Sequence, residues 1–179
     1  MNDNPAHLLA VRLKDDSVWK TANLAAPTPY RTAATIALTG RTIGGRPVDE
    51  TILCHRLTLA WNTLLANDDR PLTTPLRRRY AELLVEHDAD TLPTDHDPER
   101  AALLTFLHLW PTAPLLGALY ASHLLIHAHI GLFGMYPRQV NEFRTLADKE
   151  DTALAWLRRQ AVELVPGGLT RERMEQHGH

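Results

Sequence analysis

The 179-residue sequence has little cysteine, no motif of a common enzyme class, and one long stretch without charge. Its single cysteine, Cys54, excludes an internal disulfide and an all-cysteine zinc site, and it fits a reducing compartment. The N-terminus has no basic run followed by an apolar stretch, so it does not resemble a secretory signal. We therefore expect a cytoplasmic protein.

The familiar catalytic signatures are also missing. No glycine-rich phosphate loop, G-x-S-x-G elbow or H-E-x-x-H pair occurs in the sequence. The three glycines within 40–45 lack the lysine and the serine or threonine that follow in a nucleotide-binding loop. Cys54 and His55 are adjacent, and a helix would point them about 100° apart, which argues against a nucleophile and its base. These absences favour a non-catalytic protein.

Composition restricts the class of protein further. With 19 basic and 21 acidic side chains, the formal charge of -2 excludes a surface that is basic all over. The 44% hydrophobic content excludes a largely disordered chain. A chain of this length buries about 70% of its unfolded surface, enough for one self-sufficient core. We expect a single helical domain over 1–168, least certain over 1–45, and a polar tail over 169–179.

Prolines that follow capping residues predict where helices begin. Proline is tolerated at the first helical position, where its missing N–H would have no partner. Three such starts are Thr28-Pro29, Thr74-Pro75 and Asp97-Pro98, and two more starts with poorer caps are Arg46-Pro47 and Tyr136-Pro137. The apolar residues after them recur near every 3.6 residues, as in Leu53, Leu57, Ala60 and Leu64. No stretch combines a sustained alternation of apolar and polar residues with many β-branched side chains, so we predict an all-α fold.

The first 45 residues leave alternatives open. Residues 8–13 and 17–25 can form two short helices or one broken helix. Residues 35–42 carry enough β-branched side chains to permit a short strand.

The central stretch contains no lysine, arginine, aspartate or glutamate from 101 to 137. Residues 113–133 are long enough to span a bilayer. However, the stretch carries His108, His123, His127 and His129, which would need polar partners in hydrocarbon, and basic clusters are absent from its flanks. We therefore predict a compact multi-helix bundle around a buried central apolar helix, about 113–133, and no membrane insertion.

Two of these histidines allow a metal site as an alternative. His123 and His127 are four residues apart and share one helical face. A third ligand from another helix would complete a site for zinc, nickel or iron, and His55 is the best candidate, with His108 and Glu142 as substitutes. At His55, His123 and His127 alone, the arrangement resembles the DinB and YfiT-like bundles, which hold a divalent metal through three histidines. The opposing interpretation is core histidines bonded to carbonyls, hydroxyls or water.

Arginine clusters are the main candidate binding feature. Arg77, Arg78 and Arg79 are consecutive near one helix start, and Arg158 and Arg159 are adjacent near the C-terminus. Three consecutive residues wrap around a helix, so at least one is exposed. Planar guanidinium groups suit phosphate, and together these arginines would form a track for a nucleic-acid backbone. The opposing interpretation is an ordinary solvated surface.

An acidic run between residues 86 and 99 contains no basic residue. It lacks the glycine that a calcium loop needs, so we interpret it as a solvated linker or an acidic docking surface.

These observations favour a non-catalytic, all-helical binding subunit of a larger assembly, which needs no cofactor. Its partners would be other protein subunits, an RNA or DNA backbone through the arginines, or a second copy of itself. Helical small subunits of nucleoprotein effector complexes illustrate the class. Two alternatives stay open: a metal-dependent enzyme of bundle type that uses the three histidines, and a purely protein-binding regulator.

Overall fold

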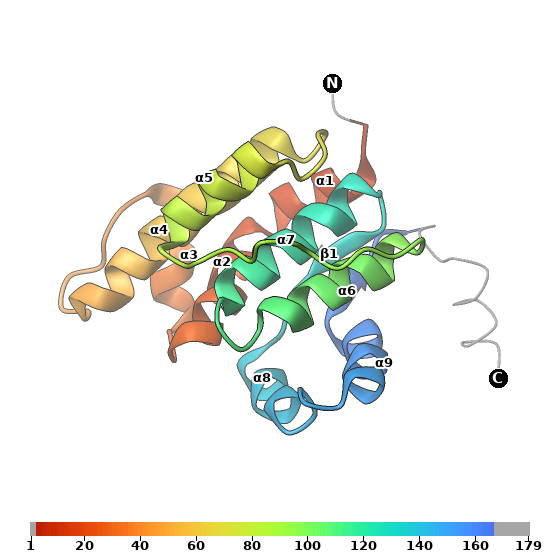
Figure 1. Cartoon of the computed structure of the whole chain (residues 1–179). Helices are drawn as coiled ribbons and strands as arrows, with labels where there is room; N and C mark the ends of the chain where they lie inside the picture. The colour runs from red at the N-terminus through yellow and green to blue at the C-terminus, as the bar shows by residue number, and fades with distance from the viewer. Residues whose placement is uncertain (1–2, 167–179) are drawn as a thin grey trace.

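The computed structural model describes residues 3–166, and this part of the chain is all-α apart from two short strands (Figure 1). The helices are α1 Pro5–Arg12, α2 Lys14–Ala25, α3 Tyr30–Thr39, α4 Val48–Asn67, α5 Thr74–Leu84, α6 Pro98–Leu109, α7 Pro114–His127, α8 Pro137–Arg144 and α9 Glu150–Gln160. The strands are β1 Gly131–Phe133 and β2 Val162–Leu164. The all-α prediction is confirmed. The predicted polar tail, 169–179, lies outside the described residues.

The five proline-based helix starts are confirmed. α3 and α4 begin directly after Pro29 and Pro47, and α5, α6 and α8 have a proline in their first turn. At α6, Asp97 Oδ1 accepts a hydrogen bond from the Glu99 N–H at 3.0 Å. That bond satisfies one of the N–H groups that a helix start leaves without a partner.

The N-terminal region forms three helices. α1 and α2 are separated by one residue, Leu13, so the two-helix alternative is correct. The strand permitted over 35–42 is wrong, because α3 continues to Thr39 and ends at Gly40 in the left-handed conformation, φ 70°. Ala33, Ile36 and Ala37 lie buried on one face of α3, which packs against α2 and α4. This burial at helical spacing outweighs the β preference of its threonines.

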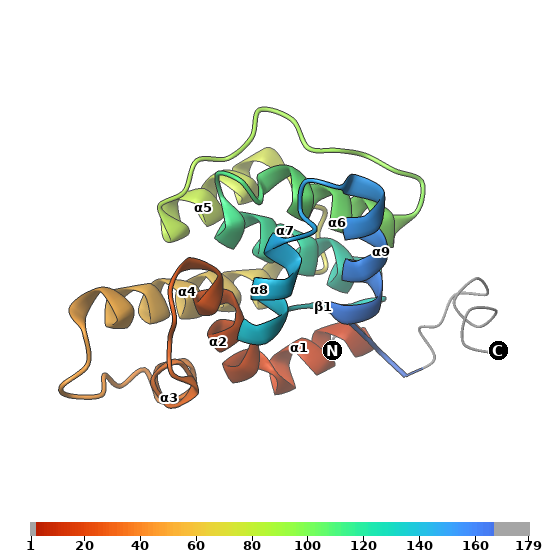
Figure 2. The same cartoon turned by 90° about the horizontal axis from the view of Figure 1, so that it is seen from below.

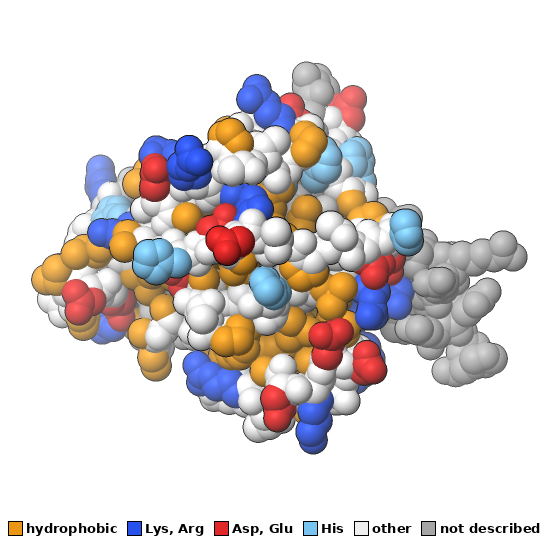
Figure 3. All heavy atoms as spheres, viewed as in Figure 1, with side chains coloured by type: hydrophobic (Ala, Val, Ile, Leu, Met, Phe, Trp, Pro, Cys, Tyr) orange, Lys and Arg blue, Asp and Glu red, His pale blue; other side chains and the backbone are white. Residues whose placement is uncertain are grey.

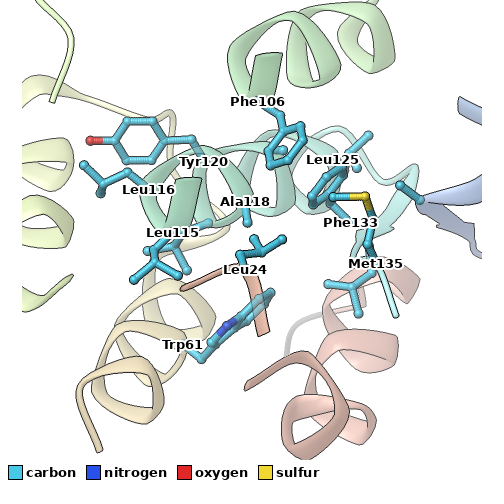
Figure 4. Packing of buried hydrophobic residues seen from close by; sticks show 14 of the residues in the cluster. Leu24, Trp61, Phe106, Leu115, Leu116, Ala118, Tyr120, Leu125, Phe133 and Met135 are labelled. Atoms are coloured by element: carbon cyan, nitrogen blue, oxygen red, sulfur yellow. The ribbon is translucent and has the colours of Figure 1, made fainter. Parts of the chain in front are cut away.

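Helix α7 is the buried centre of the bundle. It packs most extensively on α6 and also contacts α1, α2, α4 and α5. Figure 4 shows its side chains between Phe106 of α6 on one side and Leu24 and Trp61 on the other. A Cβ at Gly117 would lie 3.2 Å from Leu109 Cβ, so glycine there lets α6 approach closely.

The central helix is shorter than the predicted 113–133. It ends at His127, and His129 adopts a left-handed φ of 63°. β1 then pairs with β2 in antiparallel register, Gly131 opposite Leu164. A Cβ at Gly131 would lie 2.0 Å from the Glu163 carbonyl oxygen, so only glycine allows this pairing. Within residues 3–166, no helix has both the length and the apolar composition to cross a membrane.

Helices α8 and α9 lie on one side of the bundle (Figures 1 and 2), where α9 packs on α6 and α8 packs on α2 and α9. Aromatic side chains join them to the main core: the Phe143 ring lies 5.0 Å from Trp110 and 5.5 Å from Phe106, centroid to centroid. Buried apolar residues from α1 to the segment after β2 form one cluster. Residues 3–166 therefore share a single core.

The acidic segment between α5 and α6 crosses the surface over α7 (Figure 1). It is not simply a solvated linker, since it is held at one end by Glu86. The half-buried Glu86 carboxylate accepts a hydrogen bond from the Leu116 N–H at 2.8 Å, in the first turn of α7. Burial raises the pKa of Glu86.

Candidate functional site

Three histidines from two helices hold the turn that joins α4 to α5. His7 of α1 lies 2.5 Å from the Asp68 carboxylate, which is 1% exposed. From α7, His127 Nδ1 donates to the Asp68 carbonyl at 3.0 Å, and His123 Nε2 donates to the Arg70 carbonyl at 2.8 Å. These bonds satisfy backbone acceptors just beyond the end of α4. These hydrogen bonds therefore connect α1 and α7 to the turn.

His123 has partners on both ring nitrogens. Because Nε2 carries the hydrogen that bonds the Arg70 carbonyl, Nδ1 is the acceptor for the Tyr80 hydroxyl at 3.0 Å. His123 and Tyr80 are both 0% exposed. Burial lowers the pKa of His123 and raises that of Tyr80, so both stay neutral near pH 7. The pair is a structural hydrogen-bond relay with no access to a substrate.

The structure does not assemble the predicted three-histidine set. The His123 and His127 rings share a face, with centroids 6.3 Å apart, but His55 Nε2 lies 3.1 Å from Thr42 Oγ1. His55 precedes Asp68 by 13 residues, about 20 Å along α4. In the described part of the chain, no group of three or more His, Cys, Asp or Glu side chains is arranged to hold a metal ion.

The Arg77 side chain is bound within the fold. Its side chain, 13% exposed, pairs with Asp88 at 2.9 Å and donates to the Ala89 carbonyl at 2.6 Å. Its own carbonyl accepts from the Tyr120 hydroxyl at 3.1 Å. Arg77 therefore fixes the α5–α6 segment over α7 and is turned away from solvent.

Arg158 is also bound internally. Its Nε lies 3.1 Å from the carboxylate of Glu99, a residue that is 2% exposed, which links α9 to α6. The pair lines a cleft of about 360 Å³ between these helices, with Asp97, Arg100, Asp151 and Arg159 among the other lining residues. Carboxylates and guanidinium groups are equal in number here. The cleft therefore has no net charge to attract a polyanion.

The remaining predicted arginines are exposed, but they lie on two separate helices. Arg78 and Arg79 lie on α5, and Arg159 lies on α9. α5 packs on α7 and α9 packs on α6, and Figures 1 and 2 place α5 and α9 on opposite sides of that helix pair. On the face in Figure 3, basic and acidic side chains are interspersed. The single track expected from sequence is therefore not continuous.

The outward face of α4 carries apolar side chains that the sequence analysis overlooked. Val48, Ile52 and Leu59 are 71%, 43% and 55% exposed. They recur at helical spacing on the side opposite the core-facing Cys54, Leu57 and Leu64. Leu38, at the end of α3, is 67% exposed as well. The four- and seven-residue steps between Val48, Ile52 and Leu59 were the signal that could have identified this face.

No protein-family model matches this chain, and comparisons with curated proteins and with solved structures likewise gave no match. Function is therefore argued from geometry. His123, His127 and Tyr80 are hydrogen-bonded within the fold, whereas Arg78, Arg79 and the apolar side chains on the outward face of α4 are exposed.

Proposed function

We propose that this protein is a non-catalytic helical subunit that works by binding within a larger assembly, with Arg78 and Arg79 contacting a nucleic-acid backbone. One observation carries the proposal. The two adjacent guanidinium groups are exposed, and neither forms an ion pair within residues 3–166. The side chains best suited to catalysis, His123 and Tyr80, are buried and bonded to each other.

The chemistry of this surface suits phosphate groups. A guanidinium presents several N–H donors in one plane, which match the oxygens of a phosphate. Arg78 and Arg79 point about 100° apart around α5, so they would contact two different phosphates. Arg70, also exposed, lies in the turn before α5 and adds a third positive charge near this helix. Such contacts supply affinity without sequence preference.

Fluorescence anisotropy with labelled single-stranded RNA, single-stranded DNA and duplex DNA, at several salt concentrations, tests the proposal. The Arg78→Ala/Arg79→Ala variant should bind more weakly. The slope of log affinity against log salt should fall by about 1.4 for single strands and about 1.8 for duplex, because two phosphate contacts are lost. The matched control is Arg138→Ala/Arg144→Ala, which removes two exposed charges from α8. It should retain the full slope.

The nucleic-acid part of the proposal fails if binding is insensitive to salt, or if the α8 control loses as much affinity as the α5 variant. In that case the purely protein-binding regulator is the better hypothesis. The exposed apolar face of α4 specifically favours it, because such faces mark sites of protein association.

A further inference from the structure

The outward face of α4 has the spacing of a coiled-coil seam. Its positions alternate steps of four and three residues, and all lie within about 40° of Val48 around the helix. The residues are Val48, Ile52, His55, Leu59, Asn62 and Ala66. Four of the six are apolar, and only His55 and Asn62 interrupt the series. Two helices pair through this pattern when each inserts its seam residues between those of the other.

The seam lies directly opposite the face that α4 buries. Cys54, Leu57, Trp61 and Leu64 are 0–1% exposed and belong to the core. Single exposed leucines are ordinary on protein surfaces, but a helix that is apolar on two opposite faces has one face without a partner. Five of the six seam residues are exposed, and the sixth, His55, is half-buried beside Thr42 of the α3–α4 connection.

We propose that a second copy of this chain occupies the seam, with the two α4 helices antiparallel. In the register that we infer, Val48 of each copy meets Leu59 of the other, and Ile52 meets His55. The overlap needs only residues 48–59. This inference concerns a different surface from Arg78 and Arg79, and it stands whether or not those arginines bind nucleic acid.

Charge complementarity selects this occupant and this register. Asp49 and Arg56 are seven residues apart and flank the same side of the seam, and neither forms an ion pair in the described part of its own chain. In the antiparallel register Asp49 of each copy faces Arg56 of the other, so the pair occurs twice. Shifting one helix along the other by seven residues would instead place Arg56 of one copy against Arg56 of the other. These like charges would repel each other. A parallel pair would leave Asp49 without Arg56.

The shape of the molecule also allows antiparallel pairing. In Figures 1 and 2 the start of α4 and the α3–α4 connection extend away from the other helices. Two copies joined antiparallel through residues 48–59 have their bodies at opposite ends of the paired helices. This arrangement sets the bodies further apart than a parallel pair, which would set them side by side.

Sedimentation equilibrium of the full chain over a wide range of concentration tests the association. We expect a reversible monomer–dimer equilibrium. Leu59→Glu should weaken it by about a hundredfold or more, since each of two symmetric contacts would bury a carboxylate against valine. The matched control is Leu8→Glu. Leu8 is 58% exposed on α1 and follows His7, whose contact with Asp68 lies at the opposite end of α4 from Val48. This control should leave dimerisation unchanged, and both variants should keep the helical circular dichroism of the parent.

Charge reversal tests the register. Asp49→Arg and Arg56→Asp should each weaken the dimer by roughly tenfold, because each creates two like-charge contacts. Combining them, Asp49→Arg/Arg56→Asp, should restore the dimer. A chain that stays monomeric at every concentration would leave the seam to a helix of another protein and would overturn the proposal. So would a dimer indifferent to Leu59→Glu, or a double variant as weak as the single ones.

Discussion

The α4–α5 turn buries polar side chains, whereas the outward face of α4 exposes apolar ones. At the turn, the side chains of His123, Tyr80 and Asp68 are buried, and each has a hydrogen-bond partner. Less than one helix length away, valine, isoleucine and leucine side chains face solvent. A buried polar group without a partner is costly, so the paired ones hold the fold together. An exposed apolar group adds little to folding but is available to a partner.

The two regions differ in which side chains are already bonded within the fold and which are exposed. The histidines on α7 have the residue types of a catalytic or metal centre, yet their nitrogens bond backbone carbonyls and a hydroxyl. Val48, Ile52 and Leu59 have no catalytic chemistry, yet nothing in the monomer accounts for their exposure. Exposed apolar residues of this second kind are the ones available to a partner.

The largest expected effect is the loss of the His123 ring. His123→Ala would leave the Arg70 carbonyl and the Tyr80 hydroxyl without partners and would open a cavity beside α7. We expect the free energy of unfolding to fall by about 3–4 kcal/mol, measured by guanidinium denaturation at a concentration where the protein is monomeric.

Leu59→Ala is the matched control on the outward face. This substitution truncates an apolar side chain that is 55% exposed. The free energy of unfolding of the monomer should therefore fall by no more than about 0.5 kcal/mol. Equal losses in the two variants would contradict the distinction between the two regions.

A smaller effect is expected from Tyr80→Phe. The ring stays, with its contact to Tyr120 at 6.1 Å between centroids, and only the O–H donated to His123 is lost. The unsatisfied Nδ1 acceptor should cost about 1–2 kcal/mol in denaturation experiments. Tyr30→Phe removes an exposed hydrogen bond to Asp15 and should cost less, because both groups are solvated in the native state. If Tyr80→Phe proves no more costly than Tyr30→Phe, the buried bond does not stabilise the turn.

Local signals made much of the fold predictable. Prolines marked five helix starts, because the preference for proline at a helix N-terminus depends only on neighbouring residues. The end of the central helix was not predictable in this way. Residues 113–133 are apolar whether they form helix or strand, and the fit of Gly131 against Glu163 depends on a segment more than thirty residues away.

The candidate site was predictable in part. The spacing of His123 and His127 correctly placed them on one face, but spacing cannot reveal that their partners are carbonyls of residues 68 and 70. The run of three arginines did not show that Arg77 alone turns inward, since its partner Asp88 lies in a segment of irregular structure. The spacing of the seam on α4 is present in the sequence. However, the same helix also carries the apolar residues that face the core, so the two patterns overlap along the chain.

The smallest expected effect, and the sharpest test of the buried region, is pH dependence. Burial lowers the pKa of His123 below its ordinary value of 6.5, so in mild acid the unfolded chain binds a proton that the native chain does not. Stability should therefore be full above pH 6.5 and fall as the pH drops below it, by at most about 1.4 kcal/mol per pH unit for one proton. His123→Gln lacks this group, so its free energy of unfolding should change less between pH 7 and pH 5.5 than that of the parent. Parallel pH profiles for the two proteins would mean that the His123 ring is protonated as readily in the native state as in the unfolded one.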